Sequence, residues 1–181
     1  MKSDTIMRSF TARDGHAVVL RRVRWDDIHD LLDLINALIE ENAYIILNTK
    51  VKKEQEADWL GRYLAEIENG KRIGVAAEVD GHVVGNSEVT LKSGAQSHVG
   101  ELGIIIKTGY RDGGIGTEMI RILIEESRKR RLKLLVLRLF ADNDRARHVY
   151  EKLGFRETGR VSGALYRSGR YCDEVTMALD L

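Results

Sequence analysis

Apolar positions in residues 16–68 predict one strand followed by two helices. The segment HAVVLRRV (residues 16–23) is rich in valine and leucine and is typical of a strand. In DDIHDLLDLINALIE (residues 26–40) the apolar residues recur three and four positions apart, which indicates one face of a helix. The residues of this face are Ile28, Leu31, Leu32, Ile35, Leu38 and Ile39. A second helix is predicted from about Lys53 to Glu68.

The next three apolar runs predict an antiparallel meander. RIGVAAEV and HVVGNSEVTL flank Asp80-Gly81, and an Asp-Gly pair between two β-rich runs is a strong hairpin signal. GELGIIIK (residues 100–107) follows as a third strand.

After residue 107 the pattern changes to alternating helices and strands. An amphipathic helix is predicted from Ile115 to about Arg130, because its apolar residues fall on one face. KLLVLRLF (residues 133–140) is a strand buried on both faces, parallel to the strand before the helix. A short helix should follow, capped by Asp142 or Asn143 and ended by Gly154. ETGRVSGALYR and RYCDEVTMALDL are the last two strands.

The resulting order, β-α-α-β-β-β-α-β-α-β-β, predicts an α/β (α+β) fold. We expect a mixed, mostly antiparallel seven-stranded sheet with helices on both faces. The chain has no internal repeat, low-complexity stretch, linker or proline. Residues 1–181 are therefore expected to form a single domain.

Composition agrees with a globular domain. A chain of 181 residues buries roughly 70% of the surface that its unfolded form exposes. Apolar residues make up 43% and charged residues 31%, which favours neither disorder nor a membrane span. The first ten residues lack the apolar core of a signal peptide, so a cytoplasmic location is expected.

Charge and cysteine content narrow the partners and cofactors. The 29 lysines and arginines nearly balance the 28 aspartates and glutamates, so nucleic acid is not expected as a partner. The basic run RKRRLK (residues 128–133) falls at a helix end, where cations are favourable. The chain has a single cysteine, Cys172, which excludes an internal disulfide and a cysteine-rich metal site.

The most informative stretch is GYRDGGIGTEMI (residues 109–120), which connects a strand to a helix. The first turn of a helix presents unpaired N–H groups and the positive end of its dipole. Gly113, Gly114 and Gly116 let the backbone approach an anion closely, and Arg111 adds a cation. The stretch therefore predicts a phosphate-binding loop.

Two common phosphate loops fit these residues poorly. The Walker pattern fails because Ile115 and Gly116 replace its Lys-[ST] pair. The dinucleotide fingerprint G-x-G-x-x-G has Met119 in place of its third glycine. A nucleotide-dependent enzyme is accordingly a distant alternative.

A third pattern fits better: Arg111 to Gly116 (RDGGIG) resembles the [RQ]-x-x-G-x-[GA] motif of the GNAT superfamily of acyl-CoA-dependent N-acyltransferases. ELGIIIKTGYR before it, ADNDRARHVYEKLGF after it and the closing GRYCDEVTMAL resemble the same family in the same order. The resemblance extends from about Arg21 to Leu179. It implies an N-acetyltransferase with acetyl-CoA as co-substrate.

For the cofactor, the resemblance implies that the central parallel strands, Glu101 to Lys107 and Lys133 to Phe140, splay apart to hold CoA. The expected pantetheine contacts are Ile104, Ile105, Ile106 and Asn143, and the expected pyrophosphate contacts are the amides of Arg111, Asp112, Gly113, Gly114, Ile115, Gly116 and Thr117. Asp112 departs from the glycine that is common in the family. Asn143 also has a second explanation, as the cap of a helix.

For the chemistry, the resemblance implies that Tyr150, in RHVYEKLGF, contacts the CoA sulfur and donates a proton to the leaving thiolate. An aromatic core residue beside Leu153 and Phe155 is the alternative for Tyr150. Glu101 matches the carboxylate that acts as general base in many members, directly or through a water. The alternative for Glu101 is a solvated glutamate at a strand edge. A histidine such as His148, or a chain of waters, stays possible as the general base. A covalent route through Cys172 is disfavoured, because a lone cysteine in a strand usually belongs to the core.

In the family the acceptor pocket lies between the first two helices and the last hairpin, here about Asn36 to Trp59, including Tyr44, and the turn from Tyr166 to Tyr171. The acceptor is a primary amine, of a small molecule or of a protein N-terminus, and relatives suggest a homodimer. The alternative function is a non-catalytic domain that binds acyl-CoA as a sensor or structural partner.

Overall fold

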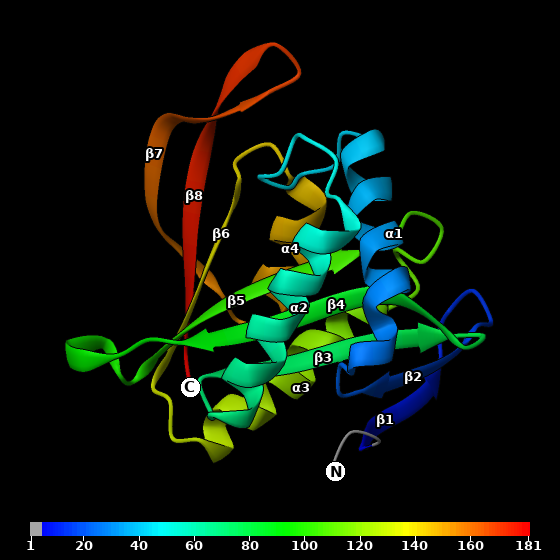
Figure 1. Cartoon of the computed structure of the whole chain (residues 1–181). Helices are drawn as coiled ribbons and strands as arrows, with labels where there is room; N and C mark the ends of the chain where they lie inside the picture. Colours follow the sequence, from blue (N-terminus) through cyan, green and yellow to red (C-terminus); the bar gives the residue numbers. More distant parts are fainter. Residues whose placement is uncertain (1–4) are drawn as a thin grey trace.

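The computed structural model describes residues 5–181, which form one eight-stranded sheet and four α-helices (Figure 1). Residues 1–4, which belong to the expected domain 1–181 and to the segment without signal-peptide character, lie outside the described residues. The strands are β1 (Ile6–Thr11), β2 (Ala17–Arg21), β3 (Arg72–Val79), β4 (His82–Leu91), β5 (Val99–Ile106), β6 (Leu134–Phe140), β7 (Arg156–Arg167) and β8 (Arg170–Asp180). The helices are α1 (Ile28–Glu40), α2 (Lys53–Glu68), α3 (Ile115–Lys129) and α4 (Asp144–Lys152).

The sheet is mixed and mostly antiparallel, as predicted, with strand order β1-β2-β3-β4-β5-β6-β8-β7 and one parallel pair, β5 and β6. The prediction of seven strands is wrong, because β1 adds an eighth along the edge of β2. Polar and charged residues interrupt its apolar positions, and only Met7 and Phe10 pack against the core. Pairing with β2, which is a tertiary contact, makes this segment a strand.

Helices cover both faces of the sheet, as predicted. One core cluster joins α3 and Tyr150 of α4 to the sheet, and it includes Met119 and Leu123. A second cluster on the opposite face joins α1 and α2 to the sheet through Leu31 and Leu60. Figure 1 shows α1 and α2 in front of β3 and β4, with α3 behind. No helix within residues 5–181 has the length and apolar character that crossing a membrane would require.

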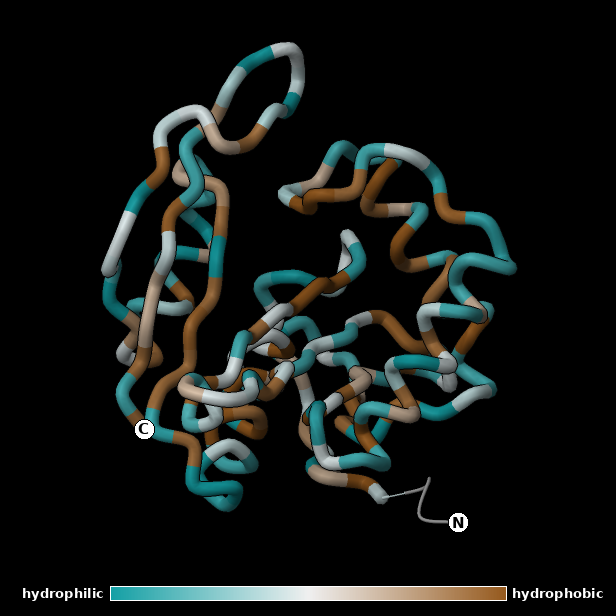
Figure 2. Tube along the Cα trace, turned by 60° about the vertical axis from the view of Figure 1, so that its left-hand side comes forward, coloured by the Kyte–Doolittle hydropathy of each residue, from teal (hydrophilic) through white to brown (hydrophobic). Residues whose placement is uncertain are grey.

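The parallel pair is short, and this divides the sheet. β5 and β6 pair only through Val99–Leu134, Gly100–Leu135 and Glu101–Val136. Beyond these pairs, β5 stays with β4 as far as Ile106, and β6 stays with β8 along its whole length. The two strands therefore diverge, as predicted (Figure 1). The β7–β8 hairpin continues outward from the β6 side (Figure 2).

Gly100 allows the close packing where the two halves meet. A Cβ at this position would overlap Val89 and would lie 2.9 Å from the Cδ2 atom of Leu135. Both neighbours are fully buried, so they have little room to move. The junction therefore requires a glycine, a requirement that the sequence pattern did not reveal.

Candidate active site

The loop between β5 and α3 presents a row of free backbone donors. None of the amides of residues 111–117 donates a hydrogen bond to another residue of the described chain. Gly114 is the N-cap of α3 and has φ +93°, and Gly109 has φ +91°. These left-handed conformations turn the chain into the helix and suit glycine. The loop has the free N–H groups and the helix N-terminus that bind phosphate.

Asp112 occupies a position that favours glycine. Its φ is +66°, in the left-handed region, where glycine has no steric cost and aspartate is tolerated. The Asp112 carboxylate accepts a hydrogen bond of 2.7 Å from Nε of Arg145 in α4. This ion pair connects the loop to the helix that follows β6.

The β1–β2 turn supports the same loop from outside. The amide of Arg13 donates to the carbonyl of Gly113 at 3.0 Å. A Cβ on Gly113 would lie 3.2 Å from Oδ2 of Asp14 and 3.3 Å from Cβ of Ala12, so the two segments are in close contact. The turn after β1, the strand that the sequence pattern did not predict, therefore helps to position the loop between β5 and α3, which the sequence pattern did predict.

Arg111 lies between the loop and the end of α1. Its Nε donates to the carbonyl of Ile106 at 2.8 Å, and its Nη2 pairs with Glu41, the C-cap residue of α1. Burial would raise the pKa of Glu41, but hydrogen bonds from Thr108 and Arg111 outweigh it and lower that pKa. A phosphate bound at the loop would share the Arg111 guanidinium with this carboxylate.

The divergence of β5 from β6 leaves backbone groups unpaired along one side of β5. Ile104, Ile105 and Ile106 keep their register with β4, but none of them has a partner on β6. Unpaired strand N–H and C=O groups can bind an extended molecule that carries amides, as another strand would.

Tyr150 of α4 is a buried phenol with an unused donor. The residue is 8% exposed, and its ring meets Phe155 edge-on with centroids 5.8 Å apart. Its hydroxyl makes no hydrogen bond to any residue in 5–181. Burial raises the pKa of Tyr150 to about 12, so the phenol keeps its proton at neutral pH. The residue belongs to the core, and it can also act as a proton donor.

Asn143 caps α4, as one of its two explanations requires. Its side-chain oxygen accepts a hydrogen bond from the amide of Ala146 at 3.2 Å. The choice between Asp142 and Asn143 as cap is thereby settled in favour of Asn143, which lies at the end of the loop that follows β6.

Glu101 lies at the last β5–β6 pair and is held by two cations. Its Oε1 accepts from Nη2 of Arg138 at 2.6 Å, and its Oε2 pairs with Lys92. Burial would raise the pKa of Glu101, but the hydrogen bonds from Lys92 and Arg138 outweigh it and lower that pKa. The carboxylate is therefore ionised at neutral pH, and it is more than a solvated edge residue.

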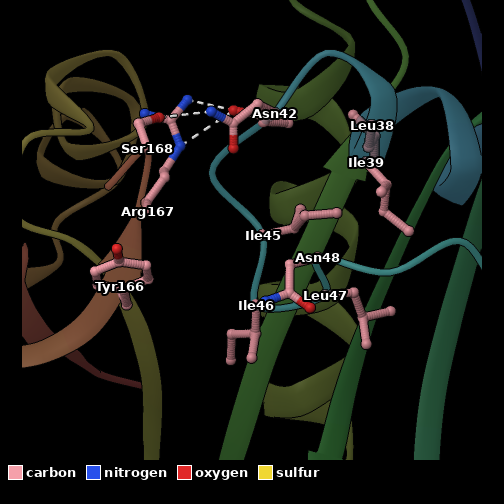
Figure 3. A pocket seen from close by; sticks show the side chains of 11 residues that line it. Leu38, Ile39, Asn42, Ile45, Ile46, Leu47, Asn48, Tyr166, Arg167 and Ser168 are labelled. Carbon is pink, nitrogen blue, oxygen red and sulfur yellow. Dashed lines mark hydrogen bonds between the residues drawn. The ribbon is translucent and has the colours of Figure 1, made fainter. Parts of the chain in front are cut away.

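The α1–α2 loop and the β7–β8 turn enclose a pocket of about 180 Å³. Arg167 donates from Nε to the carbonyl of Asn42 at 3.1 Å, and Nδ2 of Asn42 donates to Oγ of Ser168 at 2.6 Å (Figure 3). The guanidinium of Arg167 also stacks on the ring of Tyr44 at 4.1 Å. The two segments that the resemblance assigned to the acceptor thus come together.

This pocket lies at the outer end of the opening between β5 and β6. None of its lining residues comes from either strand. Tyr44, in the α1–α2 loop, packs against Phe140, the last residue of β6, with ring centroids 5.6 Å apart. Glu101 lies at the opposite, inner end, at the last ladder pair. Neither Glu101 nor Tyr150, the two candidate groups for proton transfer, therefore lines this pocket.

Comparison with known proteins identifies the family. Residues 31–155 match the Acetyltransferase (GNAT) family. The chain belongs to this GNAT family. The L-amino acid N-acetyltransferase AaaT of Escherichia coli (strain K12) is 31% identical over 106 residues, which are 58% of this chain and 65% of that protein. The chain thus spans less than two thirds of the length of this relative.

Solved structures share the whole fold. The ribosomal-protein-alanine N-acetyltransferase of Brucella melitensis superposes with a TM-score of 0.80 at 27% identity and covers 90% of this chain and 99% of its own. The yncA protein of Salmonella typhimurium, solved with its cofactor acetyl-CoA, has a TM-score of 0.80 at 20% identity, over 91% of this chain and 94% of its own.

Two members of this GNAT site were missed by sequence reasoning. Lys92 and Arg138 both bind Glu101, from positions 9 and 37 residues away in the sequence. A signal for Arg138 existed: once Glu101 is paired with Val136, strand alternation places Arg138 on the same face as Glu101. Lys92 had the same kind of signal: Thr90 is opposite Glu101, so strand alternation along β4 places Lys92, two residues further on, on the face of Glu101.

A first prediction concerns the loop. Gly114→Ala places a Cβ at φ +93°, which costs about 1–2 kcal/mol and shifts the neighbouring amides. We expect a lower free energy of unfolding in urea and a roughly ten-fold weaker affinity for acetyl-CoA by calorimetry, which corresponds to about 1.4 kcal/mol. Gly159→Ala is the matched control, because a Cβ there meets nothing within 4 Å and its φ is not left-handed. An unchanged affinity in Gly114→Ala would contradict the phosphate assignment.

Proposed function

We propose that this GNAT chain is an N-acetyltransferase that transfers the acetyl group of acetyl-CoA to a primary amine by direct attack in a ternary complex. The observation that carries the proposal is the opening between β5 and β6. Free amides follow one of these strands, and an unbonded, protonated phenol follows the other. Parallel strands end at the same edge of a sheet, so both features face one opening. The activity of the AaaT relative, an L-amino acid N-acetyltransferase, and the acetyl-CoA of the yncA structure support the proposal.

In this proposal the residues of the opening hold acetyl-CoA. The backbone groups of Ile104, Ile105 and Ile106 that are bonded neither to β4 nor to Arg111 bind the pantetheine arm, with Asn143 at its far side. The pyrophosphate lies on the amides of residues 111–117, next to Arg111. The donors fit such a group, since they are free within residues 5–181 and lie at the N-terminus of α3.

Glu101 and Tyr150 divide the proton transfers. An alkylamine is protonated at neutral pH, so one proton must leave before its nitrogen can attack. Glu101 accepts that proton, directly or through a water. The nitrogen then bonds to the acetyl carbon, the carbon–sulfur bond breaks, and Tyr150 donates its proton to the departing sulfur. A second proton from nitrogen returns to the Tyr150 oxygen or to solvent, which gives the N-acetyl amine and free CoA.

The alternative is a domain that binds acyl-CoA without turnover. Such a domain needs the loop but has no use for an ionised carboxylate and an unbonded phenol beside the opening. The presence of both groups favours the enzyme. The acceptor is the amine of a small molecule or of a protein N-terminus, in line with the names of two similar proteins, an L-amino acid N-acetyltransferase and a ribosomal-protein-alanine N-acetyltransferase.

Two further properties belong to the proposal. A cytoplasmic enzyme is consistent with the single free cysteine, Cys172. A homodimer is consistent with β7, which is an exposed edge strand over almost all of its 12 residues. A long exposed edge presents unpaired backbone groups that can pair with a second chain.

The proposal is tested by titrating the purified protein with acetyl-CoA in a calorimeter and then following free-thiol release with a panel of amines. Binding with amine-dependent release would support the transferase. Binding without release from any amine would favour the non-catalytic alternative. Absence of binding would overturn both.

Tyr150→Phe separates the acid from the core residue. The ring and its contact with Phe155 remain, while the proton donor is lost. We expect kcat to fall by about 10²–10⁴-fold, the range for a general acid, with acetyl-CoA affinity nearly unchanged. Tyr63→Phe, which removes another buried hydroxyl, on α2 and bonded to Asn86, is the control and should leave kcat unchanged. Equal losses of kcat and affinity would show that Tyr150 is structural.

Lys92→Met tests Glu101 through pH. In the wild type, the lowered pKa keeps Glu101 ionised into acidic solution, so kcat/KM should hold until the pH falls below the usual range of glutamate. Removing Lys92 removes one of the cations that lower this pKa. The pKa of Glu101 should rise, and the acidic limb of the kcat/KM profile should move to higher pH. Lys129→Met, which removes a lysine paired with Glu126 on α3, should leave the limb in place; a limb that moves in neither variant would exclude Glu101 as the base.

A further inference from the structure

Arg138 is an exposed cation with most of its donors unused. It lies on β6, two residues beyond the last residue paired with β5. Its side chain is 56% exposed, although its backbone is paired with Thr176 of β8. Nη2 donates to Glu101, and Nη1 lies 4.0 Å from Glu174, beyond hydrogen-bond distance. Of the five N–H donors of a guanidinium, one is thus bonded within residues 5–181.

The Glu101–Arg138 pair bridges the two halves of the sheet at the inner end of the opening. Glu101 comes from β5, and Arg138 comes from β6. Because Val136 is opposite Glu101 and side chains alternate along a strand, both charges project from the same face. α1 and α2 cover this face elsewhere in the sheet. Thr90 of β4 is opposite Glu101, and alternation places Glu88 and Asn86 on the same face as Thr90. Asn86 accepts a hydrogen bond there from Tyr63 of α2.

The pair is poorly explained as a stabilising contact. The Arg138 side of the pair is exposed, so water screens its charge and the pair contributes little to folding. Here the carboxylate already has Lys92 as a second partner, so Arg138 is not needed to neutralise it. The Glu101 carboxylate and the Arg138 guanidinium lie 2.6 Å apart. They instead match an α-amino acid, whose ammonium and carboxylate groups are joined through one carbon.

We propose that Arg138 binds the α-carboxylate of a free amino acid while Glu101 receives its ammonium group, so that Arg138 is the residue that selects the acceptor. This inference rests on the proposed acetyltransferase function. The unused edge of the guanidinium can bind a carboxylate through two parallel N–H donors. The amine is thereby presented to the acetyl carbon beside the group that deprotonates it.

The same charges disfavour other acceptors. A polyamine or an aminoglycoside would bring a second ammonium group towards Arg138 and Lys92. A protein N-terminus carries a neutral amide next to its amine, which offers one carbonyl oxygen where an amino acid offers two charged oxygens. Glu174 is too far from Arg138 to occupy its free donors.

The test compares matched acceptors in the thiol-release assay. Each free amino acid that the wild type acetylates is measured beside its α-amide and its decarboxylated amine. We expect kcat/KM to be at least about ten-fold higher for the amino acid, as one charged hydrogen bond provides. In Arg138→Gln, KM for the amino acid should rise by about 10- to 100-fold, whereas the amide and the amine change little relative to one another.

Three comparisons make the result specific. Arg138→Lys keeps the charge without the paired donors and should restore part of the preference for the amino acid. Arg156→Gln removes an exposed arginine paired with Asp180 on the far edge and should leave the preference unchanged. Acetyl-CoA titration of Arg138→Gln should match the wild type. Because loss of Arg138 also changes the pKa of Glu101 for every acceptor, the ratio between acceptors is the deciding quantity.

The outcomes separate this inference from the function on which it rests. A wild type that acetylates amides, simple amines or peptide N-termini as well as amino acids would overturn the inference and leave the acetyltransferase standing. An equal loss with all acceptors in Arg138→Gln would do the same. If none of the tested amines causes the wild type to release thiol from acetyl-CoA, the proposed function is overturned, and the inference with it.

Discussion

The shortness of the β5–β6 ladder is the constraint on which the rest of the structure depends. Three residue pairs join these strands, after which each strand remains with its other neighbour. Because both strands keep a full ladder on one side, they can separate on the other without losing their place in the sheet. The separation exposes backbone donors and acceptors in the middle of the fold, where a continuous sheet would have none.

The opening is maintained by contacts that are far from it in sequence. The β1–β2 turn packs on Gly113, and the end of α1 pairs with Arg111 through Glu41. The α1–α2 loop crosses to the end of β6, where Tyr44 packs on Phe140. The junction at the inner end needs Gly100, because a larger residue would push the halves apart. The loop before α3, the α1–α2 loop and the junction at Gly100 therefore all hold the opening in place.

The two groups proposed for proton transfer are shifted in opposite directions by their surroundings. Two cations lower the pKa of Glu101, whereas burial raises the pKa of Tyr150 to about 12. At neutral pH one is a charged acceptor and the other a neutral donor, the assignment that attack on a thioester requires. The groups come from opposite halves of the split sheet, Glu101 from β5 and Tyr150 from the helix after β6. The divergence that opens the site thus also separates the acid from the base.

The sequence by itself determined the elements whose signals are local. The sequence placed α2 at about Lys53–Glu68, and the period of the apolar residues began α3 at Ile115. It bounded α4 by Gly154 and by either Asp142 or Asn143, of which the structure selects Asn143. The glycine spacing of residues 109–116 marked the loop, because positive φ and close approach are properties of the local chain. Only the tertiary structure made a strand of Ile6–Thr11, brought Lys92 and Arg138 to Glu101, and paired Glu41 with Arg111. These features depend on which segments pack together and in what register. Packing between segments up to 70 residues apart decides this, and the local period of apolar residues does not specify it.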